Sequence, residues 1–475
     1  MSGEDGAGGA STRPAAAGAP GAGDGLPGWP RELPPVVREP RVPGGFAFGG
    51  LAAGIKRSGR PDLGLVRVLA GGAAAAAVFT PNAFAAAPVQ VSRRNLLATA
   101  PDGGGGHGRA DAVVSTSGSA NAATGAAGLA DQERIGGLVA DALGVPADRV
   151  LHLSTGVIGT RLPLEKVAAG LAALVPALAP TPSGLEAAAV ALRTTDSRTK
   201  LAATTLALPA PDGAPVSATV AGIAKGVGMI HPMMATMLAV VVTDATLEPA
   251  HLHSLLRRAT VRTWDQLSVD GDTSTNDTVF ALASGAAGAA PLVPGSDAEA
   301  SFLDALEAVA RDLARQQAAD GEGATTLLTC RVTGAADDPD ARAVARAVVS
   351  SSLVKAAAHG RDPNWGRIAG AAGNARLAPA AILEAGGLAP AAAATRAGTQ
   401  PRLDPARLRI SIAGHLVYDG RAGGPVPFDR AAARAALDAP ETLIRLDLGL
   451  GDGAGEAFGC DLTEEYVVEN SEYTT

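Results

Sequence analysis

A threonine just before a buried strand is the residue of this sequence best suited to nucleophilic chemistry. Thr236 follows Ala235 and precedes residues 238–242, five consecutive apolar residues typical of a strand buried on both faces. A threonine hydroxyl is a weak nucleophile unless a base lies beside it. Cleavage of the Ala235–Thr236 bond would free an α-amine, with a pKa of about 7.7–8.0, one hydrogen bond from that hydroxyl. The residues alone equally allow Thr236 simply to open a strand after a glycine-rich loop.

Six other short motifs accompany this threonine along the chain. They are Ser154-Thr-Gly-Val-Ile-Gly159, Thr194-Thr-Asp196, Ser268-Val-Asp-Gly-Asp-Thr-Ser-Thr-Asn-Asp277, Asp320-Gly-Glu-Gly-Ala-Thr325, Asp362-Pro-Asn-Trp-Gly-Arg367 and the terminal Glu469-Asn-Ser-Glu-Tyr-Thr-Thr475. In this order, and with the Lys-Gly-Val-Gly-Met run that begins at Lys225, they resemble the ornithine acetyltransferase family. Its members are self-cleaving bifunctional enzymes of arginine biosynthesis that move an acetyl group from N-acetylornithine to glutamate.

The resemblance covers the chain from about residue 45 to its last residue and implies a precursor that cuts itself before Thr236. The products would be an α chain ending at Ala235, with residues 45–235 as its folded part, and a β chain of residues 236–475. Thr236 would accept the acetyl group, with its own amine as base, and pass it to glutamate with ping-pong kinetics. The family also implies an α2β2 heterotetramer.

The same resemblance assigns roles to residues on both sides of the cut. The Thr155 hydroxyl and the Gly156 N–H would stabilise the oxyanion, and the glycine permits the close backbone approach that a tetrahedral intermediate demands. Lys225, eleven positions before Thr236, would bind substrate, and Glu322 would pair with the cationic amine of ornithine. Without the family, these residues fit a turn before a helix, a solvated lysine and a polar turn ahead of a strand.

Three further substrate contacts follow from the resemblance, namely Thr194, Asn470 and Thr475. Thr195 adjoins the first of them, so an offset of one residue stays open. The other two lie at the end of the chain. A chain end normally frays and contributes to a site only when it is tied down.

The sequence departs from the family pattern in two places. The usual Asn-Ser-Gly-Asn-Ala-Asn run is Thr116-Ser-Gly-Ser119-Ala-Asn here, so two hydroxyls replace two amides. Near the predicted cut, Val227, His231 and Met233 stand where the family usually has a small residue, an alanine and an asparagine. These changes predict a different processing rate or acceptor preference, and they suit a paralogue recruited to a secondary pathway.

Residues 268–277 superficially suggest a calcium loop. An EF-hand loop that begins at Asp270 requires glycine at its sixth position and glutamate at its twelfth, where Thr275 and Ala281 stand. The interpretation we favour is a hydrogen-bonded loop that braces the active site, with residues 362–367 in the same role. The sequence implies no metal and no cofactor, and acetyl-CoA stays open as an additional substrate.

Composition excludes several classes of function. The 475 residues are 47% hydrophobic, enough for a substantial core and two or three domains. The net charge is −8 without any block of Lys or Arg, which indicates neither a nucleic acid nor an anionic membrane as partner. Two cysteines, Cys330 and Cys460, are too few for a disulfide framework and favour a reducing compartment. With no recognisable secretory signal or membrane span, we expect a cytoplasmic protein that binds small molecules.

The elements that must position these groups follow from the periodicity of apolar residues. Residues 1–44, rich in Gly, Ala and Pro, predict a disordered tail, and residues 384–402 predict a surface loop. Apolar runs typical of strands occur at 65–69, 74–79, 112–114 and 238–242, and helical patterning at 130–143, 165–175, 185–193, 249–264, 298–319, 340–357 and 430–437. Together they predict an α+β fold, a layered αββα-like sandwich of the self-processed N-terminal-nucleophile type.

Two other functions remain compatible with the residues. A self-processed amidase or aminopeptidase would share the nucleophile but pass the acyl group to water. A catalytically inactive binding or scaffolding relative would no longer cut itself and would remain one chain.

Overall fold

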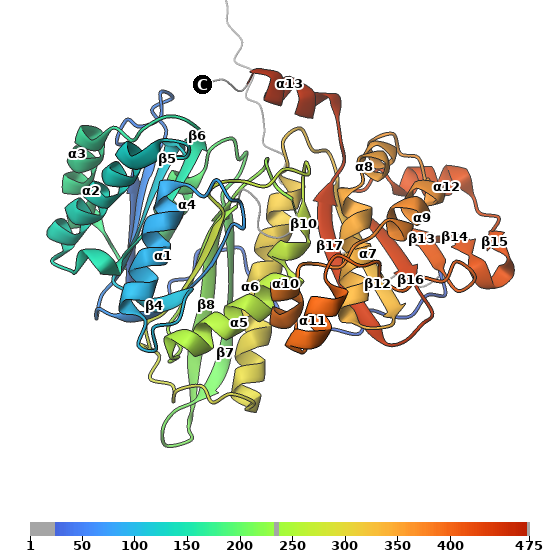
Figure 1. The fold of residues 1–475 in the computed structure, drawn as a ribbon, viewed down its shortest axis with the longest axis horizontal. Coiled ribbons are helices and arrows are strands. Elements are labelled where there is room, and N and C mark those ends of the chain that lie inside the picture. The colour runs from blue at the N-terminus through green and yellow to red at the C-terminus, as the bar shows by residue number, and fades with distance from the viewer. Residues whose placement is uncertain (1–23, 232–236, 473–475) are drawn as a thin grey trace, which may run out of the picture.

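Three β-sheets, with helices between and around them, form the molecule (Figure 1). The computed structural model describes residues 24–231 and 237–472. In Figure 1 the N-terminal part of the chain lies on the left and the C-terminal part on the right, and the last helix lies at the top, above the middle of the molecule.

The first sheet comes entirely from the N-terminal part of the chain. Its strands, in spatial order, are β1 (Phe46–Leu51), β2 (Leu63–Val68), β5 (Ala112–Ser119) and β6 (Val150–Val157). Neighbouring strands are antiparallel except β5 and β6, which are parallel. Successive residues point to opposite faces, so Val113 and Val114 enter two different cores. Both faces of this sheet are therefore covered.

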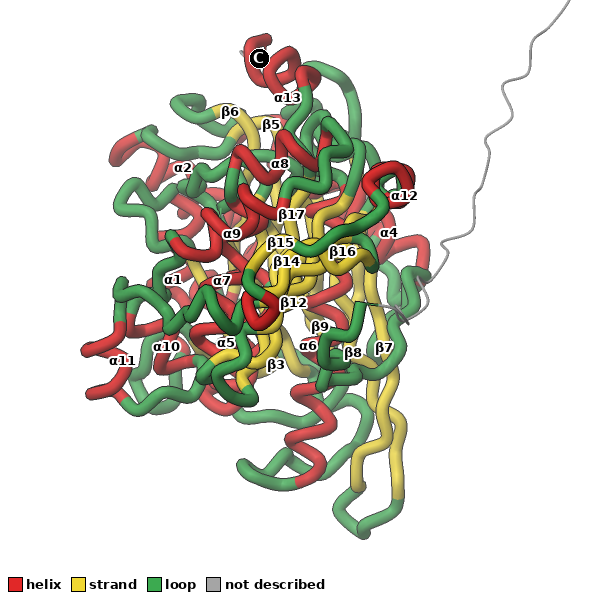
Figure 2. The backbone as a smooth tube through the Cα atoms, turned by 90° about the vertical axis from the view of Figure 1, so that its right-hand side faces the viewer, coloured by secondary structure: helices red, strands yellow, loops and turns green. Residues whose placement is uncertain are grey.

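The second sheet places the strand after Thr236 at its centre. Its order is β4 (His107–Ala110), β3 (Ala73–Phe79), β11 (Thr278–Ala283), β9 (Leu238–Thr243), β8 (Pro215–Lys225) and β7 (Lys200–Pro209). All six residues of β9 are buried, as its unbroken apolar run predicts. β9 runs parallel to β11 and antiparallel to β8. β7 and β8 extend together beyond the body of the molecule as a hairpin (Figure 2).

Helices cover the outer faces of these two sheets and also lie between them. They are α1 (Ala87–Thr99), α2 (Gly125–Leu143), α3 (Leu164–Leu174), α4 (Pro182–Leu192), α5 (Pro249–Arg262) and α6 (Asp297–Ala319). Ile135 of α2 and Leu171 of α3 pack on the first sheet. Leu96 of α1 and Leu185 of α4 enter the core between the sheets, and Phe302 of α6 packs on the far face of the second sheet. The predicted layered α+β fold is confirmed.

The third sheet belongs to the C-terminal part of the chain. Its order is β10 (Leu267–Ser268), β17 (Gly453–Cys460), β12 (Leu327–Ala335), β16 (Glu441–Asp447), β13 (Arg409–Ile412), β14 (His415–Asp419) and β15 (Gly424–Pro425). The helices that accompany it are α7 (Asp338–Ser350), α8 (Ser352–His359), α9 (Trp365–Gly373), α10 (Ala380–Ala385), α11 (Pro390–Arg396), α12 (Arg430–Ala436) and α13 (Glu464–Glu472). Cys330 and Cys460 are buried free thiols within it. No helix of the described ranges is long and apolar enough to cross a membrane.

Two expected boundaries in this part need correction. The helix expected over residues 340–357 is two helices, because Ser351 adopts extended backbone and its hydroxyl caps α8 by accepting the N–H of Val354 at 3.3 Å. The loop expected over residues 384–402 contains α11. That helix buries Ala393 beside Leu383, a local apolar contact that its low-complexity sequence obscured.

The predicted tail is also corrected, since residues 24–44 are held by distant parts of the chain. Both oxygens of Asp24 accept hydrogen bonds from Arg445 at 2.7 Å, and Val37 pairs with Ala203 as an antiparallel bridge. The composition of this segment is poor in apolar residues, but its partners are supplied by the folded body. Residues 1–23 lie outside the described residues.

Candidate active site

A cavity of about 250 Å³ collects the described residues that the sequence predicted to be functional. Its lining comes from the ends of β6 and β8, from α13 and from the loops between elements. The predicted residues that line it are Thr155, Gly156, Thr194, Lys225, Glu322 and Asn470. The other predicted residues, Ala235, Thr236 and Thr475, lie outside the described residues, as does Met233.

The end of β6 carries the two predicted oxyanion donors. The pairing of β6 with β5 becomes irregular at Gly118, which lies opposite Gly156. Gly156 has a φ of +129°, and a Cβ at this position would lie 2.4 Å from the carbonyl carbon of Gly118. Only glycine fits this backbone, so the approach of the two strands depends on it. Thr155, directly before it, is buried and lines the cavity.

Lys225 ends β8 and is buried beside Thr155. Its Nζ donates a hydrogen bond to the Oγ1 of Thr155 at 3.0 Å, and its backbone carbonyl accepts one from the side chain of Gln317 at 2.8 Å. Burial lowers the pKa of Lys225, the charge of Asp196 opposes this effect, and the charge of Lys200 adds to it. This lysine is a fixed part of the site, rather than the solvated side chain that its glycine-rich surroundings also allowed.

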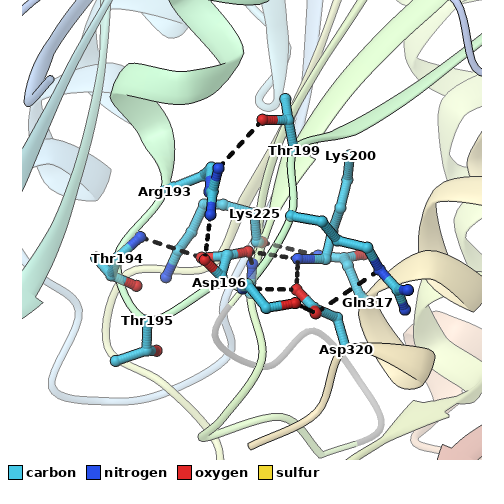
Figure 3. A network of polar contacts seen from close by, with 12 residues as sticks. Arg193, Thr194, Thr195, Asp196, Thr199, Lys200, Lys225, Gln317 and Asp320 are labelled. Carbon is cyan, nitrogen blue, oxygen red and sulfur yellow. Dashed lines mark hydrogen bonds and ion pairs between the residues drawn. The ribbon is translucent and has the colours of Figure 1, made fainter. Parts of the chain in front are cut away.

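A buried cluster of charged side chains, Asp196, Lys200 and Asp320, lies next to Lys225 (Figure 3). The ammonium of Lys200, whose side chain is fully buried, lies 2.6 Å from Asp196 and 2.5 Å from Asp320. Asp196 also accepts the backbone N–H groups of Gly226, at 2.9 Å, and Thr194, at 3.1 Å. Burial alone would raise the pKa of Asp196, but the charges of Lys200 and Lys225 outweigh it and lower the pKa to about 2. Ionised Asp196 therefore accepts hydrogen bonds from two segments that flank the cavity, one at Thr194 and one at Gly226.

Glu322 lines the cavity beside Val227, whose backbone carbonyl accepts its N–H at 2.8 Å. Thr195 donates its hydroxyl to one carboxylate oxygen at 3.0 Å, and the amide of Asn470 on α13 donates to the other at 3.0 Å. Each oxygen of an ionised carboxylate accepts about two hydrogen bonds, so capacity for a cationic ligand remains. Of the two adjacent threonines, Thr194 contributes its backbone N–H to Asp196 and Thr195 its side chain to Glu322.

The loop of residues 268–277 braces the site, as predicted. Asp270 accepts the backbone N–H of Ile230 at 2.8 Å and also that of Met229, which has a left-handed φ of +54°. Asn276 donates to the backbone carbonyls of Ala120, at 2.7 Å, and of Ser154, at 2.8 Å. The loop therefore ties the segment before the predicted cut to the strand end that bears Thr155.

The residue that follows Thr236 is anchored by the same loop. Asp277 accepts the backbone N–H of Met237 at 2.8 Å, and its second oxygen has no hydrogen-bond partner among the described residues. Burial raises the pKa of Asp277 well above its ordinary value. The register of the β8–β9 ladder then sets Leu238 opposite Lys225.

The described departures from the family pattern keep polar contacts. Thr116 hydrogen-bonds the Ser154 hydroxyl at 2.9 Å, and Ser119 donates to a backbone carbonyl at 2.7 Å. Val227 lines the cavity and accepts the backbone N–H of Glu322 through its carbonyl. His231 lies 3.4 Å from Ser268, and burial lowers its pKa. The hydroxyls thus replace amides without leaving the strand ends unsupported.

Residues 362–367 do not have the bracing role that the sequence suggested. Asn364 caps α9 by accepting the N–H of Arg367 at 3.1 Å, and none of these residues lines the cavity as the described residues define it. The same described residues contain no group of three or more His, Cys, Asp or Glu side chains suited to hold a metal ion.

Sequence reasoning gave no role to the charge cluster. Asp196 and Asp320 stand inside quoted motifs, each two residues from a predicted ligand, and Lys200 follows Asp196 by four positions. The spacing of four residues between Asp196 and Lys200 indicates an ion pair between them. The pairing of Lys200 with Asp320 is visible only in the folded protein. Chemically, the cavity combines a threonine hydroxyl held by a buried ammonium with the carboxylate of Glu322. It suits a ligand that has both a carbonyl group and a cationic amine.

Comparison with known proteins identifies the family of the chain. The sequence profile of the ArgJ family matches residues 47–475. An arginine biosynthesis bifunctional protein ArgJ from Thermus thermophilus is 44% identical over 435 residues, which are 92% of this chain and 99% of the relative. The protein of that name from Synechocystis sp. is 44% identical over 446 residues, 91% of this chain and 97% of the relative. A solved ornithine acetyltransferase from Mycobacterium tuberculosis, complexed with ornithine, is 39% identical, with a TM-score of 0.36 and an aligned region of 42% of this chain and 97% of the solved chain. The chain belongs to the ArgJ family.

Proposed function

We propose that this protein transfers an acetyl group from N-acetyl-L-ornithine to L-glutamate through an acetyl ester on Thr236. The protein first cuts itself between Ala235 and Thr236 by attack of the threonine hydroxyl on the preceding carbonyl, followed by hydrolysis of the resulting ester. The observation that carries the proposal is the single cavity that gathers the predicted ligands from both halves of the chain. Membership in the ArgJ family supports the same reaction.

The strand that follows Thr236 supports its role as nucleophile. Thr236 is bonded to Met237, whose N–H is held by Asp277, and the next residue, Leu238, is paired with Lys225. The new α-amine would then take the hydroxyl proton as the oxygen attacks.

Acylation develops negative charge on the carbonyl oxygen of the acetyl group. The Thr155 hydroxyl and the Gly156 N–H would donate hydrogen bonds to this oxyanion. Lys225 Nζ donates to the Thr155 oxygen, which leaves the hydrogen of that hydroxyl available for the substrate. One donor of this kind is worth about 10²–10³ in kcat. The C–N bond then breaks, and the α-ammonium returns its proton to the departing amine of ornithine.

Glu322 would hold the cationic amine of ornithine in the same cavity, and Thr195 and Asn470 orient its carboxylate. After ornithine leaves, the amine of glutamate attacks the acetyl ester, and Thr236 is regenerated. The two substrates use the enzyme in turn, so the kinetics are ping-pong. Acetyl-CoA would acylate the same hydroxyl as an alternative donor.

We further propose a cytoplasmic α2β2 assembly of two α chains and two β chains. Both chains contribute to the cavity, because Thr155 and Lys225 precede the cut and Glu322 and Asn470 follow it. Native mass spectrometry of the purified protein tests this assembly, and a mass equal to one α chain and one β chain would contradict it.

The decisive experiment combines electrophoresis with a transfer assay. Wild-type protein should run as two fragments, and mass spectrometry should place the new terminus at Thr236. Thr236→Ala should remain a single chain of 46.8 kDa. Ornithine release from N-acetylornithine should need glutamate, whereas release at the same rate without glutamate would indicate an amidase. An uncut protein that transfers acetyl groups at full rate would refute the mechanism, and acetyl-CoA in place of N-acetylornithine tests the second donor.

A further inference from the structure

A second cavity, of about 490 Å³, lies away from the catalytic one and shares no lining residue with it. One wall is the extended segment of residues 29–36, and the others come from α6, α7, β12 and the start of β17. Its volume is typical of sites that bind small molecules. The lining is rich in charge of both signs, so the pairing of these charges decides what the cavity can bind.

Most of the lining charges are already compensated within the protein. Glu456 pairs with Arg311, at 2.9 Å for one of two contacts, and with Arg331 at 3.3 Å. Glu307 pairs with Arg31 at 2.7 Å and with Arg262 at 3.2 Å. These arginines and glutamates are already ion-paired within the protein and do not require a charged ligand.

Arg342 is different. Its side chain is only 6% exposed, and its nearest acidic partner, Asp338, lies 3.7 Å away, beyond hydrogen-bond distance. Among the described residues, the guanidinium of Arg342 makes no hydrogen bond, whereas that of Arg311 bonds Glu456 at 2.9 Å. Burial lowers the pKa of Arg342 to about 10, so the group remains protonated at neutral pH. Arg342 lines the cavity, so an anion there could make the close hydrogen bonds that Asp338 does not make at 3.7 Å.

The surrounding acids restrict the kind of anion. Asp312 lines the cavity but pairs with Arg38 at 2.8 Å. Asp338 and Asp452 also line it, and Asp452 is exposed. A multiply charged anion such as phosphate would be repelled by these carboxylates, whereas one carboxylate matches the planar fork of a guanidinium. A ligand with a cationic group at its other end would complement the acids as well.

We propose that this cavity binds a small basic amino acid, with its carboxylate on Arg342 and its cationic end toward Asp452. The site is separate from the catalytic cavity and does not depend on the proposed acetyl transfer. Trp29, in the wall formed by residues 29–36, lies with its ring 5.0 Å from the guanidinium carbon of Arg331. A ligand in the cavity would change the surroundings of this indole, which supplies a local reporter.

The test is a fluorescence titration of the full-length protein with L-arginine, L-lysine and L-ornithine. Each is compared with its decarboxylated amine, namely agmatine, cadaverine and putrescine, and with inorganic phosphate. We expect at least one of the amino acids to change the emission of wild type but not of Trp29→Phe, and its decarboxylated amine to bind at least about tenfold more weakly. Equal binding of an amino acid and its amine, or stronger binding of phosphate, would overturn the proposal.

Variants separate the two cavities. Arg342→Gln should weaken the titration at least about tenfold, because it removes the charged donor. Arg430→Gln, an exposed arginine of α12 that lines neither cavity, is the matched control and should bind as wild type does. Glu322→Gln should also leave the Trp29 signal unchanged, and its loss would show that the probe reports on the catalytic cavity. Should Arg342→Gln not fold, the comparison of amino acids with amines in wild type still decides the matter.

Discussion

Replacement of Asp196 by asparagine tests the buried scaffold beneath the active site. The wild-type carboxylate accepts hydrogen bonds from Lys200 and from two backbone N–H groups, those of Thr194 and Gly226. Asparagine keeps nearly the same shape but loses the charge, and its amide nitrogen cannot accept a hydrogen bond. One of the three donors is therefore left without its acceptor, and Lys225 loses the negative charge that opposes the effect of burial on its pKa.

The size of the effect follows from the pKa of this carboxyl. The folded protein lowers it from 3.8 to about 2. That difference corresponds to about 2.5 kcal/mol of stability at neutral pH. A depressed carboxyl pKa contributes stability that is fully present above the unfolded pKa and is lost as the pH falls through the folded one. Since Lys200 keeps Asp320 as a partner, we expect Asp196→Asn to cost about 3 kcal/mol, the lower end for a broken buried ion pair.

Urea unfolding followed by circular dichroism measures this change. The parent, Asp196→Asn and the control variant all carry Thr236→Ala, so that single uncut chains are compared. Asp212→Asn, at an exposed turn where the carboxylate only accepts the N–H of Ala214, is the matched control. The control should unfold as the parent does at pH 7, and Asp196→Asn at a clearly lower urea concentration, with the gap closing from pH 4 toward pH 2. If the two variants unfold together at pH 7, the charge cluster does not stabilise the fold and this reasoning is wrong.

Three further substitutions probe the cavity walls. Glu322→Gln should raise the KM for N-acetylornithine by roughly 10- to 100-fold, because a charged hydrogen bond is lost, and should leave chain cleavage unchanged on a gel; an unaltered KM would exclude the amine contact. Gly156→Ala should reduce kcat by at least about 10²-fold, because the new Cβ meets the backbone of Gly118. Gly137→Ala, in the middle of α2 where a Cβ meets no atom, is the control; it should keep the activity of wild type and melt at the same temperature or higher. Asn276→Ala leaves two buried carbonyls without their donor and should lower the free energy of unfolding by about 2–4 kcal/mol in urea, so a loss below about 0.5 kcal/mol would contradict its bracing role.

The candidate site was predicted from sequence more completely than the elements that carry it. Thr155 and Gly156, Lys225 and Glu322 each stand in a short motif that names the residue and its neighbours, and all four line one cavity. Helix ends were less certain, because capping by Ser351 and the small apolar face of α11 depend on one or two contacts. Residues 24–44 were misjudged since their partners, such as Arg445, lie hundreds of residues away.

The sequence by itself determined the family, because the short motifs and their order are properties of the chain alone and do not depend on distances in the fold. It also predicted the buried central strand, since five consecutive apolar residues that include three valines are typical of a strand buried on both faces. Only the tertiary structure decided how these groups are held. Lys200 lies between Asp196 and Asp320, which stand more than a hundred positions apart in the chain, and α13 returns to bring Asn470 to Glu322. Such contacts are set by the packing of whole layers, and no local pattern of residues encodes them.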